Sequence, residues 1–341
     1  MASLSRLALS LGLGLALGLA PEPSFGAGGP SPQPGKRASK AAEAKAKRAK
    51  GKQKPGRRAE KGKLTGRSSR TGKRGVPAAE VAISPRQPPL AIVARDIECP
   101  PDMVAVAGRV CVDRFETSIV DVSSGAAWPP FYTPDLPRAR AVFDFYTKAD
   151  APPTILQNAP AIPELPRLSI RPLARSVSGL LPQGYLSADQ AQAACVAAGK
   201  RLCSEAEWVT ACRGEEQRDF PYGDRYEQGT CNVWREGHPS ALLHDNAARY
   251  HDDPRNHLLE VGGRPLLQPT SEKSRCASRW GDDAVIDMVG NLDEWVSDAE
   301  GVFVGGFYSR GTRTGCLSRV STHVRSYSDY STGARCCKDP G

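Results

Sequence analysis

The chain has 341 residues, of which 40% are hydrophobic and 6% aromatic, and it contains 33 Gly, 29 Pro and 10 Cys. This length allows one large domain or two ordinary ones. Beyond the first twenty residues no apolar run is long enough to span a bilayer, so we expect no permanent transmembrane helix. Low aromatic content with abundant Gly and Pro predicts a loop-rich fold rather than a helical bundle.

The start of the chain is typical of an export signal. Arg6 precedes an apolar run from Leu7 to Ala20, and small residues around Gly26 offer a cleavage site. We therefore predict that residues 1–26 are a signal peptide and that the mature protein is secreted or periplasmic, in the cell envelope, with no transmembrane helix after processing. An uncleaved anchor is the alternative, but the run is short for a span. In an oxidising compartment, ten cysteines predict about five disulfides.

Residues 27–94 form a predicted disordered basic tether. Between Lys36 and Arg74 there are 17 Lys+Arg and 2 Asp+Glu, a net charge of +15. Because the whole chain carries +9 and residues 1–35 and 75–94 are neutral, residues 95–341 carry −6. A segment without aromatics and nearly without large aliphatics cannot offset its chain entropy by burial. It is either a polycation that binds an anionic envelope polymer or a solvated spacer. No nucleic-acid partner is expected, since no aromatics are interleaved for base stacking.

The folded region is predicted to span residues 95–341 and to open with a hairpin over residues 99–116, where apolar residues alternate around the turn Ala107-Gly108. Cys99 and Cys111 lie on its two predicted strands, which favours a local disulfide between them. Residues 124–184 are rich in proline and poorly periodic, so we expect an irregular insertion there.

Two helices are predicted from their N-terminal capping boxes. Ser187 is followed three residues later by Gln190, and Ser204 by Glu207. An apolar face follows each box, and Gly199 and Gly214 mark the two C-terminal ends.

Several blocks of this region resemble the sulfatase-modifying-factor family, the formylglycine-generating-enzyme domain. Residues 199–208 resemble its signature GKRLPTEAEW, residues 220–224 its YPWGD, and residues 287–295 its DMVGNVWEW. Residues 304–308 and 333–336 resemble its closing RGGSW and GFRC. The resemblance implies an α+β, loop-rich, C-type-lectin-like single domain that is stapled by disulfides.

The same resemblance implies two long-range disulfides. Two helix cysteines of the family bond to two cysteines near the end of the chain, which implies Cys212–Cys316 and Cys195–Cys336. The remaining cysteines have no pairing that the sequence decides; they are Cys203, Cys231, Cys276 and Cys337.

Calcium is the expected metal. An oxygen-rich turn with a carboxylate at each end and a glycine between suits a hard cation, and the resemblance implies side-chain ligands from Asp287 and Glu294 with carbonyl ligands from Gly290 and Leu292. The alternative is an acidic helix start. A second site would use Asn232 and Val233, with an acidic partner near Asp245.

Four clustered histidines follow no zinc or iron pattern, because their spacings of six and seven residues match no known ligand set, so we interpret them as loop histidines. They are His238, His244, His251 and His257.

The catalytic pattern of the family is broken in this chain. The resemblance implies oxidation of a sulfatase cysteine to an aldehyde by oxygen, with copper(I) held by two thiolates after the Gly-Gly-Ser motif. Here Phe307 stands at the serine, Arg310 at the first catalytic cysteine, and Asp293 at the usual tryptophan of the WEW segment. Cys316 is a weak catalytic candidate, because its position matches a structural disulfide better, and copper is not expected.

Two functions therefore remain open. The first is a non-catalytic binding module of the cell envelope whose partner is an anionic envelope polymer or another protein. The second is a formylglycine-generating oxidase with a displaced metal site. Residues of the late loop are the candidate ligand surface of the binding module; they are Trp295, Tyr308, Arg310, Arg313, His323 and Arg325.

Overall fold

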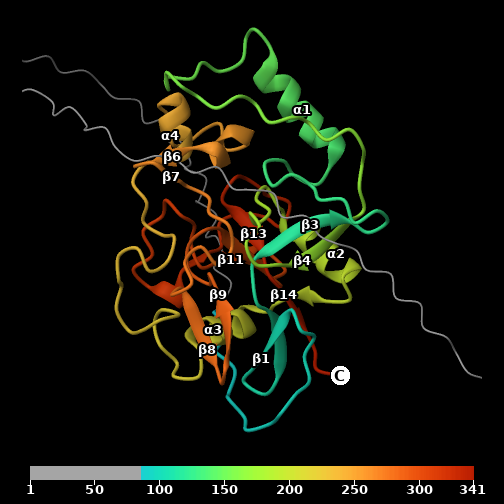
Figure 1. The fold of residues 1–341 in the computed structure, drawn as a ribbon, viewed down its shortest axis with the longest axis vertical. Coiled ribbons are helices and arrows are strands. Elements are labelled where there is room, and N and C mark those ends of the chain that lie inside the picture. The colour runs from blue at the N-terminus through green and yellow to red at the C-terminus, as the bar shows by residue number, and fades with distance from the viewer. Residues whose placement is uncertain (1–85) are drawn as a thin grey trace, which may run out of the picture. The chain divides into compact units, whose positions relative to one another are not determined.

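The computed structural model describes residues 86–341, so the predicted signal peptide and most of the predicted tether lie outside the described residues (Figure 1). The backbone contacts the domain from Leu90, whose N–H donates to the Thr210 hydroxyl at 2.7 Å. Val93 follows, with its N–H donating to the Ala107 carbonyl at 3.0 Å. No helix within residues 86–341 is long and apolar enough to cross a membrane.

The first sheet contains the predicted hairpin. Its strand order is β1 (Met103–Val106), β2 (Val110–Asp113), β14 (Cys336–Lys338) and β5 (Arg201–Leu202), all antiparallel. Positive φ angles at Ala107 and Gly108 reverse the chain between β1 and β2. The C-terminal strand therefore lies in the middle of a sheet that opened at the start of the domain.

The second sheet carries the late part of the chain. Its order is β12 (Arg319–Val320), β11 (Val302–Val304), β10 (Asp293–Val296) and β13 (Thr332–Ala334), with β10 and β13 parallel. Only Arg335 separates β13 from β14, so this residue lies where the chain passes from one sheet to the other.

Both predicted capping boxes are present. The helix α2 (Ala188–Ala197) begins after Ser187, and α3 (Glu205–Arg213) begins after Ser204. In each, the serine hydroxyl accepts a backbone N–H and the side chain three residues later accepts the serine N–H, which satisfies donors that a helix start leaves unpaired.

The insertion is more regular than predicted. β3 (Thr117–Asp121) pairs with β4 (Pro172–Ser176), and α1 (Leu136–Thr147) begins after the N-cap Asp135. Figure 1 shows α1 at the edge of the domain, away from both four-stranded sheets. The expectation of an irregular segment was wrong because α1 buries only Ala139 and Tyr146 fully, which leaves little apolar periodicity in the sequence.

The remaining elements are short. They are α4 (Pro239–His244), the 3₁₀ turns at Pro254–Leu258 and Gly315–Leu317, and the paired strands β6 (Glu260–Val261) with β7 (Arg264–Pro265) and β8 (Ala277–Trp280) with β9 (Asp283–Ile286).

Two of the four histidines are buried rather than solvated loop residues, which corrects that prediction. His244 lies at the end of α4 and contacts the Asp253 carboxylate at 2.8 Å and the Pro153 carbonyl at 3.0 Å. His257 lies against the Tyr330 carbonyl, and burial lowers its pKa to about 4. Tertiary contacts, which the spacing of histidines does not encode, decide their burial.

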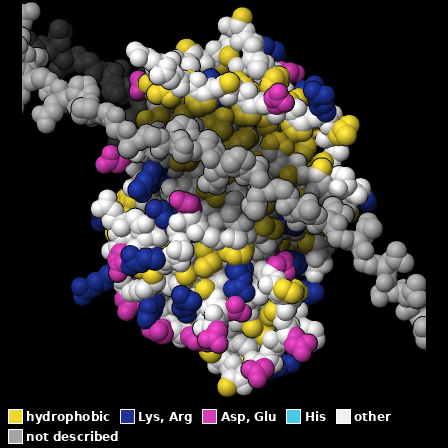
Figure 2. Space-filling view, viewed as in Figure 1, with side chains coloured by type: hydrophobic (Ala, Val, Ile, Leu, Met, Phe, Trp, Pro, Cys, Tyr) yellow, Lys and Arg dark blue, Asp and Glu magenta, His cyan; other side chains and the backbone are white. Residues whose placement is uncertain are grey.

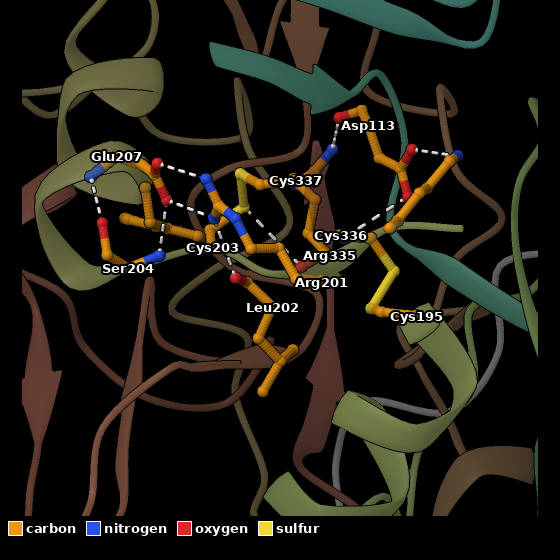
Figure 3. Close-up of a disulfide and its surroundings, with 12 residues drawn as sticks. Asp113, Cys195, Arg201, Leu202, Cys203, Ser204, Glu207, Arg335, Cys336 and Cys337 are labelled. Carbon is orange, nitrogen blue, oxygen red and sulfur yellow. Dashed lines mark hydrogen bonds and ion pairs between the residues drawn. A yellow bond between two sulfur atoms is a disulfide. The ribbon is translucent and has the colours of Figure 1, made fainter. Parts of the chain in front are cut away.

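All ten cysteines form disulfides. The three predicted pairs are present as Cys99–Cys111, Cys195–Cys336 and Cys212–Cys316, and the undecided cysteines pair as Cys203–Cys337 and Cys231–Cys276. Cys99 precedes β1 rather than lying on it, but its bridge to β2 is formed. Figure 3 shows the neighbouring residues Cys336 and Cys337 bridged to two different segments, at Cys195 and Cys203. The fold is thus α+β, loop-rich and disulfide-stapled, as predicted.

Candidate functional site

An ion pair occupies the position that the resemblance assigns to the first catalytic cysteine. Arg310 follows β11 and the turn Gly305-Gly306, and its Nη2 contacts the Oδ2 of Asp293, the first residue of β10. Asp293 is fully buried, whereas 29% of the Arg310 side chain is exposed. The chain therefore presents a cation at a place where the family's chemistry needs a thiolate.

Aromatic rings support the Arg310 guanidinium. Its central carbon lies 5.0 Å from the ring centre of Phe307 and 5.9 Å from that of Phe303, a geometry in which the ring faces attract a cation. His323 stacks on Phe303 and on Tyr327, and the Tyr327 hydroxyl donates to Asp329. The late loop thus builds an aromatic wall around one positive charge.

The carboxyl group of Asp293 has a strongly perturbed pKa. The pKa is raised to about 7, chiefly by burial. The positive charge of Arg310 acts to lower it, and the negative charge of Asp329 acts to raise it. The backbone N–H of Gly306 also lowers the pKa. A buried acid that titrates near neutral pH is frequent at binding and catalytic sites.

Several polar atoms around this pair are buried and lack a hydrogen-bond partner in the part of the chain that the structure describes. Within the loop that follows β11 and on β10, they are Asp293 Oδ1, Tyr308 Oη, Arg310 Nη1 and Thr312 Oγ1. Each unpaired buried group costs about 1–3 kcal/mol. A bound water or a rearrangement of the loop that supplied partners would recover this free energy.

The predicted ligand surface is only partly exposed. Trp295 and Tyr308 are fully buried. Trp295 lies on β10 and donates its Nε1–H to the Leu186 carbonyl, and Tyr308 packs in the core. Arg325 is held by Asp189 and the Asp298 carbonyl. Arg310 and His323 are partly exposed and Arg313 is exposed, so these three remain available for a ligand.

Cys316, the weak catalytic candidate, lies in the 3₁₀ turn Gly315–Leu317 and is bonded to Cys212 of α3. It is fully buried. The structure brings no second thiol to it, because every cysteine of the chain is in a disulfide.

The first predicted calcium ligand set is occupied by protein donors. The Glu294 carboxylate accepts from Arg335 Nη2 at 2.9 Å, from Arg335 Nε at 3.1 Å and from Trp208 Nε1 at 2.6 Å. Arg335 is fully buried and also donates to the carbonyls of Asp113 and Ile286. The Asp287 carboxylate accepts the Ser271 N–H at 2.8 Å. The guanidinium of Arg335 therefore balances the negative charge of Glu294. Its hydrogen bond to the Asp113 carbonyl is visible in Figure 3.

The second predicted set is arranged in the same way. Asn232 approaches the Asp287–Asn291 turn so closely that a Cβ on Gly290 would lie 2.3 Å from the Asn232 carbonyl oxygen. The Asn232 Oδ1 accepts from Arg235 Nη1 at 3.3 Å, and Arg235 also donates to the carbonyls of Val261, Arg264 and Pro265. Asp245 is exposed and caps α4 instead of joining Asn232. Neither Val233 nor Leu292 is exposed.

These donor sets do not fit calcium, which needs six to eight oxygen ligands free of other donors. No group of three or more His, Cys, Asp or Glu within residues 86–341 is arranged to hold a metal ion. Sequence reasoning missed the two arginines because their oxygen partners come from distant segments, and it missed Glu116. Glu116 is buried, accepts from Asn291 Nδ2 at 2.7 Å and from the Leu292 N–H at 3.2 Å, and has a pKa raised well above its usual range by burial.

Comparison with known proteins gives a family match over part of the chain. Residues 172–336 match the family model of the sulfatase-modifying factor enzyme 1-like domain. A search of curated proteins gives no match. Among solved structures, the U1 variant of a major tropism determinant is similar at 13% identity and a TM-score of 0.35, covering 72% of this chain and 54% of that one. This chain thus spans about half the length of that structure.

Two further solved structures are similar. CarF has 13% identity and a TM-score of 0.34, with 68% of this chain and 87% of that chain covered. PvdO from Pseudomonas aeruginosa has 14% identity and a TM-score of 0.33, with 71% and 90% covered. The family match confirms, over residues 172–336, the resemblance read from the motifs. The chain therefore carries a sulfatase-modifying factor enzyme 1-like domain over residues 172–336.

Proposed function

We propose that this protein is an exported binding module of the cell envelope that has lost the oxidase chemistry of its family and recognises its ligand around Arg310. One observation carries the proposal: the Arg310–Asp293 pair stands where the family's reaction needs the first of two thiolates. A guanidinium neither binds copper(I) nor carries out thiol chemistry, whereas it is well suited to hold an anionic group.

The surroundings of Arg310 support binding rather than structure alone. A purely structural ion pair would satisfy its hydrogen bonds within the protein, but Arg310 Nη1 and Asp293 Oδ1 have no partner within residues 86–341. The partly exposed Arg310 and the stacked His323 and Tyr327 rings provide polar and flat surfaces of the kind found in ligand sites.

Export is the second part of the proposal. Five disulfides are typical of proteins that fold outside the cytosol, where thiols are not kept reduced. The apolar run Leu7–Ala20 and the basic segment Lys36–Arg74 supply a signal and an attachment to anionic envelope polymer.

The alternative, a formylglycine-generating oxidase, requires two neighbouring thiolates. Cys316 would have to leave Cys212, and a second cysteine would have to leave another bridge, before a copper(I) site could form. No observation on the described residues favours this rearrangement.

Copper titration of the native protein tests the proposal. Protein purified without reductant is titrated with copper(I) and is also incubated with oxygen and a cysteine-containing sulfatase peptide, with aldehyde formation followed by mass spectrometry. We expect no stoichiometric copper binding at sulfur and no aldehyde. Tight binding of one copper(I) with aldehyde formation would reinstate the oxidase. Protein reduced before titration is the matched control, since its freed thiols bind copper(I).

A further inference from the structure

Trp234 differs from the four other tryptophans of the chain. Each of those is buried and donates its Nε1–H to a protein oxygen: Trp128 to the Tyr132 carbonyl, Trp208 to Glu294, Trp280 to the Ala211 carbonyl and Trp295 to the Leu186 carbonyl. Trp234 is 40% exposed. A large aromatic ring is therefore placed partly in solvent.

The backbone holds Trp234 in an unfavourable conformation. Its φ of 61° is in the left-handed region, which bulky side chains rarely adopt. Its ring meets Tyr226 edge to face at a centroid distance of 4.7 Å. Such strain persists only where the surrounding structure imposes it, and it concentrates at ligand-binding positions.

The structure places this indole beside the Arg310 site. A Cβ on Gly311 would lie 2.3 Å from Trp234 Nε1, so the ring packs directly over the residue that follows Arg310. The Arg235 N–H donates to the Tyr308 carbonyl at 2.7 Å, and the Ser309 hydroxyl donates to the Gly237 carbonyl at 2.8 Å. The Trp234 loop and the Arg310 loop are therefore joined side by side.

Positive charge lies beside the indole on this combined surface. Arg310 is partly exposed and Arg313 is exposed, whereas the polar atoms of Arg310, Thr312 and Asp293 that lack partners among residues 86–341 are buried. A matching ligand has a flat apolar face for the indole and an anionic group for the guanidinium.

We propose that Trp234 and Arg310 form one recognition surface for an acidic sugar, a uronic-acid-type residue of an anionic glycan; this rests on the proposed binding function and names its ligand class. The C–H face of the pyranose stacks on the indole, and its carboxylate is held by the partly exposed guanidinium side chain of Arg310. An acidic peptide supplies the anionic group but not a rigid, flat apolar face for the indole, so it fits less well.

Binding of trigalacturonate to the full chain tests the proposal. The measurement uses 0.3 M salt, which shortens the range of the tether's charges, and the tether is identical in every variant. We expect trigalacturonate to bind the wild-type protein and to protect Trp234 from acrylamide quenching, since the other tryptophans are buried.

Trp234→Asn is the decisive variant. Asparagine tolerates the left-handed region, so we expect an unchanged or higher melting temperature together with at least tenfold weaker binding of trigalacturonate. Arg310→Gln should also weaken binding at least tenfold, but it disturbs Asp293, so Trp234→Asn keeps the test independent of folding. Phe145→Ala removes another exposed aromatic ring, on α1, and should leave affinity unchanged.

Two other probes separate the remaining outcomes. Equal binding of neutral cellotriose would overturn the acidic-sugar assignment, and equal binding of a triglutamate peptide would replace the glycan with an acidic peptide. Wild-type affinity in Trp234→Asn would overturn the role of the indole. None of these results bears on copper or aldehyde formation, so a failure here is distinguishable from a failure of the proposed binding function.

Discussion

The guanidinium of Arg310 pairs with the buried carboxylate of Asp293 at the point where the second sheet meets the late loop. Both residues depart from the family pattern, in which these two positions carry a cysteine and a tryptophan. The two departures contact each other, so an ion pair stands at the positions that the family pattern gives to a cysteine and a tryptophan. The aromatic rings of Phe303 and Phe307 remain beside it.

Removing the cation should destabilise the domain. Arg310→Met leaves the fully buried Asp293 without its partner, and we expect a loss of about 2–4 kcal/mol in the free energy of unfolding, less than for a fully buried pair because Arg310 is partly exposed. Urea unfolding at pH 8 measures it. The double variant Arg310→Met with Asp293→Asn should recover most of the loss; equal losses in the single and double variants would contradict this account.

Asp293 should also make stability depend on pH. Its folded-state pKa, raised to about 7 by burial, lies above the ordinary value of 3.8, so the folded state holds the proton more tightly than the unfolded state does. The favourable contribution is complete below about pH 4 and is lost as the pH rises to about 7. Wild-type stability relative to Asp293→Asn should fall over this range and be constant above it. A difference that rises with pH in the same range would mean that the carboxylate is stabilised when ionised.

Calcium should be dispensable for folding. Arg335 and Arg235 donate to oxygens of both predicted ligand sets, so a chelator should leave Tm unchanged. Arg335→Met should cost about 3–5 kcal/mol, because it leaves the buried Glu294 unpaired. Arg235→Met removes the donor to Asn232. Its control is Arg264→Met, because Arg264 contacts Arg235 only through its backbone carbonyl, which the substitution leaves in place. A drop in Tm on chelation would show that a metal is needed after all.

The neighbouring bridges Cys195–Cys336 and Cys203–Cys337 should act non-additively. While one is present, the other closes only a short loop, so removing either pair by serine substitution should cost about 3 kcal/mol. Removing both opens a much longer loop and should cost more than twice as much. Denaturant unfolding of the two single-bridge variants and the double-bridge variant measures these costs. Additive losses would indicate that the bridges act independently.

The basic tether should govern attachment rather than folding. Deleting residues 36–74 removes a net charge of +15 but leaves Leu90 and its bond to Thr210 in place. We expect an unchanged Tm and a loss of salt-sensitive retention on isolated cell envelope. Figure 2 shows basic and acidic side chains interspersed on the lower part of the face drawn, without one dominant sign. Undiminished retention of the deletion variant would make the segment a spacer.

Local chemistry explains which parts of the fold the sequence predicts. The capping boxes at Ser187 and Ser204 and the turn at Ala107-Gly108 depend on neighbouring residues, so they are visible in the sequence. The α1 helix is not, because few of its side chains are buried.

The site is predictable only in part for the same reason. The loss of the thiol at Arg310 is visible from the motif. Its pairing with Asp293, the guanidinium donor at Glu294 and the approach of Trp234 to Gly311 arise from tertiary contacts between segments that are apart in the sequence. The burial of Trp295 and Tyr308 likewise depends on which face of the loop packs inward.

Mass analysis of the untreated, exported protein tests the central claim most directly. Alkylation under denaturing, non-reducing conditions followed by peptide mapping should find no free thiol and five bridges, among them Cys212–Cys316, Cys195–Cys336 and Cys203–Cys337. Two free thiols from Cys316 and either Cys336 or Cys337 in the native protein would contradict the account, because they would supply the thiolate pair that an oxidase of this family requires.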